Sequence, residues 1–122
     1  MTDDIRLAGQ PKPTALIRLF FGDGDHDFRI KFEQLEELQE KLKQGPMRTL
    51  LNFETGDWSA ESVFQIIRLG LIGGGKSPSE AFALAGRYCI DRPIAESAPV
   101  AAAVMSAALM GAPVAAAEPV DV

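Results

Sequence analysis

The sequence predicts an α+β fold, in which an N-terminal β-hairpin is followed by four to five short α-helices packed as a small bundle. Two apolar runs flank a Gly-Asp-Gly-Asp turn at residues 22–25, which is the pattern of a hairpin. Apolar residues then recur at helical spacing, in segments divided by glycine and proline. A length of 122 residues, 47% of them apolar, fits one small core. We expect a flexible leader over residues 1–13, a single domain over 14–111 and a flexible tail over 112–122.

The hairpin has one apolar face. Its first strand is predicted from an apolar run that comprises Leu16, Ile17, Leu19, Phe20 and Phe21. After the turn, three large side chains alternate with Arg29 and Lys31 and should share a face: Phe28, Ile30 and Phe32. Because an isolated two-stranded hairpin is marginal in water, we expect this face to pack against the helices.

The first two helices follow at once. Residues 33–44 place Leu35, Leu38 and Leu42 at helical spacing, and Gly45-Pro46 should end this helix. Its acidic run and its terminal lysines are typical of a solvated face that matches the helix dipole. A brief helix is then predicted from Met47, Leu50, Leu51 and Phe53, closed by Thr55-Gly56.

Three more helices complete the pattern. Ser59 is the expected N-cap of a helix that runs to Leu71 or Ile72 and carries Val63, Phe64 and Ile67 on its apolar side. Residues 77–90 form the next, with Ala81, Leu84, Ala85 and Tyr88 facing inward. Asp91-Arg92-Pro93 separates it from a last helix, from about Pro99 to Met110, that is buried or docked on a partner.

Residues 70–77, GLIGGGKS, satisfy the phosphate-loop pattern G-x-x-x-x-G-K-[ST]. A phosphate loop follows a buried strand and opens directly into a helix, whereas here a helix enters the glycines. Ser77-Pro78-Ser79-Glu80 is a helix start with Ser77 as N-cap, proline at N1 and Glu80 completing a capping box. We interpret the segment as a glycine joint between two helices, in which at least one of Gly73, Gly74 and Gly75 has positive φ. The alternative is a nucleotide site with Lys76 on the phosphates.

Composition argues against several function classes. Twelve basic and seventeen acidic residues give a net charge of −5, so nucleic acid is not an expected partner. The C-terminal apolar stretch is broken by Pro99, Pro113 and Pro119 and is too short for a membrane span. The single Cys89 and an acidic N-terminus without a signal-peptide pattern place the chain in the reducing cytoplasm.

The sequence offers no convincing enzyme, cofactor or metal site. His26 is expected in the hairpin turn as a solvated residue, without other ligands at metal-binding spacing. Asp23 and Asp25 are interpreted as turn formers, because a calcium loop needs more oxygen ligands over about twelve residues. Cys89 is expected to be buried as a small apolar residue.

Apolar residues in excess of what the core needs favour an interaction protein. They are Trp58, the first strand and the Ala/Val/Met helix at the end. Trp58 is the candidate partner-binding residue, and the alternative is that it fastens its loop onto the following helix. The sequence leaves open whether copies of the chain associate.

Three segments resemble a known family: residues 55–59 (TGDWS), 67–81 (IRLGLIGGGKSPSEA) and 87–96 (RYCIDRPIAE). They are similar to small tail proteins of gene transfer agents and related siphophages, labelled phage tail tube protein of the gene-transfer-agent type and grouped with tail assembly chaperones. The resemblance runs from about Thr14 to Gly111. The residues that match its motif are Arg68, Gly73, Gly74, Gly75, Ser77, Pro78 and Glu80, and we assign them to building the helix joint.

The resemblance implies a non-enzymatic protein that acts during assembly of the tail. A chaperone of this kind would hold the long, helical tape measure protein in solution and help to recruit tail tube subunits. The alternatives are a structural component of the tail tube, which would remain in the particle, and a cytosolic helical adaptor unrelated to phage. We favour the chaperone, because a tube subunit usually needs a larger β-sandwich than two strands provide.

Overall fold

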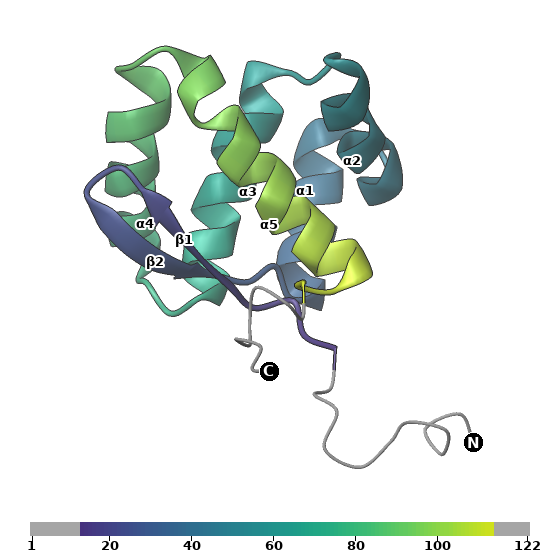
Figure 1. Ribbon diagram of the computed structural model, residues 1–122, viewed down its shortest axis with the longest axis horizontal. Helices are drawn as coiled ribbons and strands as arrows, with labels where there is room; N and C mark the ends of the chain where they lie inside the picture. The colour runs from purple at the N-terminus through teal and green to yellow at the C-terminus, as the bar shows by residue number, and fades with distance from the viewer. Residues whose placement is uncertain (1–12, 114–122) are drawn as a thin grey trace, which may run out of the picture.

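The predicted α+β order is confirmed by a computed structural model, which describes residues 13–113 (Figure 1). The predicted leader lies outside the described residues except for Pro13, and so does the tail beyond Pro113. One antiparallel hairpin precedes five α-helices, and a π-helical turn (Gly86–Ile90) and a 3-10 turn (Ile94–Glu96) join the last two. The elements are β1 (Ile17–Phe21), β2 (Gly24–Phe28), α1 (Phe32–Leu42), α2 (Pro46–Thr55), α3 (Ala60–Gly73), α4 (Pro78–Ala85) and α5 (Ala98–Met110).

The hairpin is shorter than predicted. β1 pairs with β2 in a register that sets Ile17 opposite Phe28 and Phe21 opposite Gly24, so that only Gly22 and Asp23 form the turn. His26 therefore lies in β2, and its expected place in the turn was wrong. The prediction that Phe28, Ile30 and Phe32 share one strand face was also wrong. Phe28 and Ile30 are buried, but Phe32 begins α1 and is 72% exposed.

Helix α3 is the centre of the core. It contacts α1, α4, α5 and β2, and its buried side chains are Ser62, Val63, Gln65, Ile66, Ile67, Leu69 and Leu71. In Figure 1, α5 crosses in front of α3, and the hairpin lies in front of α4. The apolar face of the hairpin contributes Phe21 and Phe28, whose rings meet edge to face with centroids 6.2 Å apart. The fold thus encloses one core, with α3 in contact with most other elements.

Two helix ends differ from their predicted positions. α1 ends at Leu42, before Gly45-Pro46, because Lys43 adopts a left-handed conformation with φ 53°. Gly45 instead precedes α2 as its N-cap residue, with Pro46 in the first turn. The helix predicted over 77–90 keeps its α geometry only to Ala85 and continues as the π-helical turn, in which the Asp91 amide donates to the Gly86 carbonyl.

Candidate protein-binding surfaces

The glycine joint is a helix end packed against the edge of the hairpin. α3 runs through Gly70 to Gly73, and Gly75 has φ +121°, so the predicted positive φ is confirmed. A Cβ on Gly73 would overlap the carbonyl group of Arg29, and one on Gly74 would overlap that of Asp27. The joint therefore needs glycine at these two positions because backbone meets backbone there.

The amides of the joint are already engaged. The Gly74 amide donates to Gly70, the Gly75 amide to Ile72 and the Lys76 amide to Leu71, over 2.9–3.0 Å. A phosphate loop needs such amides to point at the ligand. The geometry is that of a helix C-terminus, which favours the joint over a nucleotide site.

Ser77 and Glu80 form the predicted capping box of α4. The Glu80 amide donates to the Ser77 hydroxyl over 3.2 Å, and the Ser77 amide donates to the Glu80 carboxylate over 3.3 Å. Pro78 occupies the first turn. These three residues begin a helix, as the sequence indicates.

Arg68 connects α3 to α1. Its guanidinium donates to Gln65 over 2.7 Å and 3.0 Å and to the Glu37 carboxylate of α1 over 3.1 Å. The Arg68 side chain is 15% exposed, whereas the Glu37 side chain is 47% exposed, so only the arginine end of this ion pair is sheltered from water. Arg68 is accordingly placed to orient one helix against another.

Trp58 packs within its own chain. Its ring is stacked on that of Phe53 in α2, with centroids 6.2 Å apart and an interplanar angle of 13°. Trp58 thus contacts the preceding helix, whereas the sequence offered the following helix as the alternative. Its predicted role in partner binding stays a prediction.

The residues considered from the sequence for metal binding or catalysis include His26, Asp23 and Cys89. His26 Nε2 lies 2.9 Å from Asp23 Oδ1, and this hydrogen bond is the main cause that lowers the pKa of the Asp23 carboxyl. Cys89 is buried, as predicted, and burial raises the pKa of its thiol. Within residues 13–113, no group of three or more His, Cys, Asp or Glu is placed to hold a metal ion.

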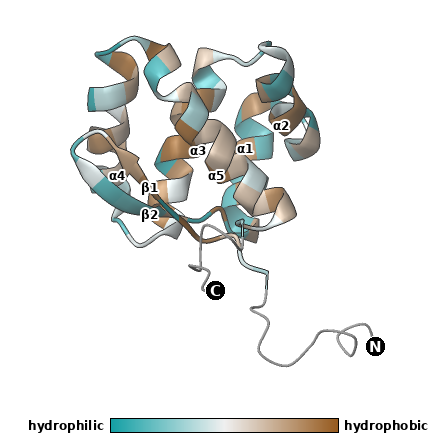
Figure 2. Ribbon diagram, in the orientation of Figure 1, coloured by the Kyte–Doolittle hydropathy of each residue, from teal (hydrophilic) through white to brown (hydrophobic). Residues whose placement is uncertain are grey.

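Helix α5 carries the most unusual surface. Residues 97–117 contain no charged residue, and this stretch includes all of α5. Its outward side consists of small or apolar side chains, and Figure 2 shows the helix pale or brown along most of its length. A helix that is apolar all round is normally buried, yet Ala102, Ala103 and Ser106 are only partly buried and Met110 is 68% exposed.

A hollow of about 460 Å³ lies between α5 and α2, here called the α2–α5 groove. Two exposed side chains of α2, Met47 and Leu51, stand one helical turn apart and line it. The full lining consists of Met47, Leu50, Leu51, Phe53, Glu54, Ala102, Ala103, Ser106 and Met110. With Glu54 as its one charged lining residue, the groove can accept an apolar side chain or a helix ridge.

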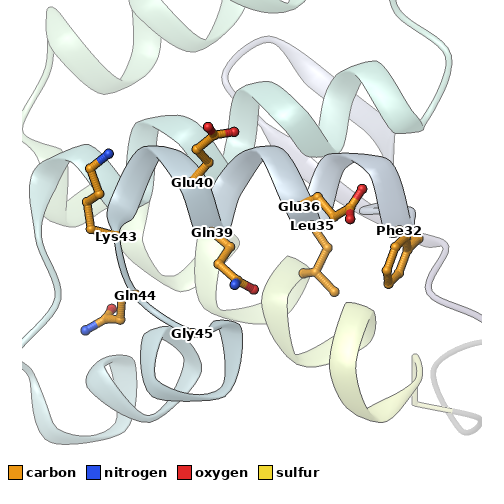
Figure 3. A pocket seen from close by; sticks show the side chains of 8 residues that line it. All are labelled: Phe32, Leu35, Glu36, Gln39, Glu40, Lys43, Gln44 and Gly45. Carbon is orange, nitrogen blue, oxygen red and sulfur yellow. The ribbon is translucent and has the colours of Figure 1, made fainter.

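A second hollow, of about 890 Å³, follows one side of α1 and is here called the α1 groove (Figure 3). It is lined by Phe32, Leu35, Glu36, Gln39, Glu40, Lys43, Gln44 and Gly45. Reasoning from the sequence assigned this side of the helix to solvent and missed it. The available signal was Phe32, a large apolar residue directly before the acidic run, which the sequence prediction assigned to the hairpin although it begins α1.

Among the described residues, no helix combines the length and the apolar character needed to cross a bilayer. Neither groove is lined by a residue of the glycine motif at 70–77.

Comparison with protein families gives one match. The family described as "Phage tail tube protein, GTA-gp10" matches residues 14–111, which is most of the chain. The chain belongs to this family of phage tail proteins. Neither a curated protein nor a solved structure matches it.

Membership confirms the resemblance seen in the three sequence segments. The family description names a structural tail protein, and it does not say whether this member is a permanent subunit of the tube or a factor that leaves. For a tail protein, contact with other proteins of the tail is the natural use of exposed apolar surface. The α2–α5 groove and the α1 groove are the two candidate contact surfaces.

Proposed function

We propose that this tail protein is an assembly chaperone that binds the tape measure protein and helps to recruit tail tube subunits. The observation that carries the proposal is the α2–α5 groove, in which the uncharged helix α5, with its exposed Met110, lies beside exposed Met47 and Leu51 of α2. Exposed apolar surface of this kind marks an interaction site on a small soluble domain. Methionine suits such a site, because its flexible side chain adapts to different partners.

The overall charge supports the same role. A net charge of −5 keeps a protein with an apolar groove in solution, and it would do the same for a complex that covers an apolar helical partner. Of the acidic residues within 13–113, Glu54 alone lines the α2–α5 groove. A helix can thus dock through its apolar side while the complex keeps a charged exterior.

The second candidate function is a structural component of the tail tube, which the family's printed description favours. A closed ring of tube subunits commonly requires a larger β-structure than one hairpin. Residues 13–113 contain one two-stranded sheet, and for this reason we prefer the chaperone. As a chaperone, the protein would act in the cytoplasm of the host cell and leave the finished particle.

Co-expression tests the proposal. The tape measure protein from the same gene cluster should be largely insoluble alone and soluble with the wild-type chain. Met110→Glu places a charge in the α2–α5 groove and should abolish most of this gain. The matched control is Ile90→Glu, because Ile90 is 66% exposed but lies on the π-helical turn, outside the groove. Equal solubilisation by both variants, or no gain with the wild type, would contradict the proposal.

A further inference from the structure

The α1 groove follows a regular stripe on one side of α1. Six of its lining residues recur at spacings of three, four, seven, eight and eleven, namely Phe32, Leu35, Glu36, Gln39, Glu40 and Lys43. Residues at these spacings share one helix face. Figure 3 shows Leu35 and Gln39 pointing to the same side, with Phe32 in the first turn. The groove is thus a helix face about three turns long.

The first turn of this stripe is apolar. Phe32 is 72% exposed, although Ile30, two residues earlier, is buried in the core. Leu35 is half-buried and packs against the edge of the core. A large aromatic ring in water next to a half-buried leucine is a suitable anchor for a partner, because aromatic residues dominate interface energetics.

The middle of the stripe is acidic, and the exposed Lys43 follows at its end. Within residues 13–113, no salt bridge involves Glu36 or Glu40, whereas Glu37 on the adjacent face pairs with Arg68 at 3.1 Å and Lys41 at 4.0 Å. Gln39 and Gln44 add amide donors and acceptors along the same groove. A partner that brings positive charge to Glu36 and Glu40 would gain attraction without competing for an existing pair.

We propose that the α1 groove binds a basic amphipathic helix of a partner protein. Its apolar residues would pack on Phe32 and Leu35, and its Lys or Arg residues would meet Glu36 and Glu40 one turn apart. A second copy of this chain is a poor occupant, because its net charge of −5 would be repelled by the acidic stripe. The proposal goes beyond the chaperone role, since the α1 groove shares no lining residue with the α2–α5 groove.

Titration with synthetic helical peptides tests this inference. The probe is a peptide of about 18 residues with leucine on one face and lysine on the other, which is long enough to form a helix on a surface. The control peptide has glutamate in place of every lysine. Backbone amide shifts of the full chain in NMR spectra should move for residues 32–45 with the lysine peptide, and the binding should weaken with added salt.

Variants of the chain test the acidic residues Glu36 and Glu40 separately from the aromatic anchor Phe32. Glu36→Lys combined with Glu40→Lys should weaken binding of the lysine peptide about tenfold or more, and Phe32→Ala should weaken binding of both peptides. The matched control is Asp57→Lys with Asp91→Lys, which makes the same change of net charge at exposed positions outside both grooves. Circular dichroism checks that each variant keeps its helical content.

Three results would overturn the inference. One is equal affinity for the lysine and glutamate peptides. Another is equal weakening by the α1 variant and its control, which would reduce the effect to net charge. The third is a set of shifted amides confined to α2 and α5. None of these depends on the tape measure protein, so the proposed chaperone role stands or fails separately.

Discussion

At the residue scale, Gly73 shows how the sequence motif serves the fold. Its Cα lies so close to Arg29, the residue after β2, that any Cβ would overlap the Arg29 carbonyl. The Arg29 amide donates to Gly70 over 2.9 Å, which holds the chain after β2 against the end of α3. The joint thereby covers one edge of a hairpin that would be marginal alone.

Gly73→Ala should accordingly destabilise the protein by about 2–3 kcal/mol, because the strand and the helix end must separate to admit a methyl group. Denaturant unfolding measures the loss. Gly86→Ala is the matched control, since Gly86 has helical φ and ψ and no atom within 4 Å of the added Cβ. That change should be neutral or stabilising by about 0.5 kcal/mol. Equal effects of the two would show that the joint tolerates side chains.

Cys89 gives a pH prediction at the same scale. Burial raises the pKa of its thiol above the unfolded value, so the native state favours the protonated form. The stability that this preference contributes is complete below the unfolded pKa, about 8.5, and is lost as pH rises through the folded pKa. The free energy of unfolding should therefore fall more steeply above about pH 8.5 in the wild type than in Cys89→Ala. Parallel curves would contradict a buried thiol.

At the scale of elements, most of the sequence prediction holds where a local signal dictates the structure. The Ser77 capping box and the Ser59 N-cap are present because each hydroxyl meets an amide three residues on. The second strand was misplaced because Phe28, Ile30 and Phe32 alternate as in a strand, while the turn takes only Gly22 and Asp23. Phe32 then starts a helix, and no local pattern distinguishes the two uses of alternation.

The π-helical turn after α4 could not be predicted from the sequence pattern either. Residues 86–90 fit the same apolar spacing as a continued α-helix. Tertiary contacts accompany the wider turn: Tyr88 meets Phe21 edge to face at 5.7 Å, and its carbonyl accepts from the Ser97 hydroxyl at 3.1 Å. Phe21 comes from the distant hairpin and Ser97 is the N-cap residue of α5, and the spacing of apolar residues reveals neither contact.

The Ser77 hydroxyl at the N-cap of α4 should contribute to the stability of the protein. Ser77→Ala removes the hydroxyl that accepts from the Glu80 amide and should cost about 1 kcal/mol of stability. Ser79→Ala is the control, because Ser79 makes only a 3.5 Å contact with Ser77 and should cost little. Thermal unfolding of the two variants measures the difference. A loss of similar size in both would mean that Ser77 does not act as a cap.

At the scale of the whole molecule, the candidate surfaces were only partly predictable. The apolar C-terminal stretch is visible in the sequence, and it predicts a helix from about Pro99 to Met110 that is buried or docked on a partner. The groove itself requires Met47 and Leu51 of α2 to lie beside Ala103 and Met110 of α5, which only the packing of the two helices determines. The glycine motif, by contrast, is conspicuous in the sequence, and it builds a helix end that packs against the hairpin.

A chaperone and a tube subunit differ most clearly in where the protein is found at the end of assembly. A tube subunit stays in the particle in many copies, whereas a chaperone that covers the tape measure protein is displaced as the tube forms. Quantitative mass spectrometry of purified particles measures this directly. As a chaperone, the chain should be absent from the particle or far less abundant than the major tube subunit. A copy number close to that of the major tube subunit would contradict the chaperone role.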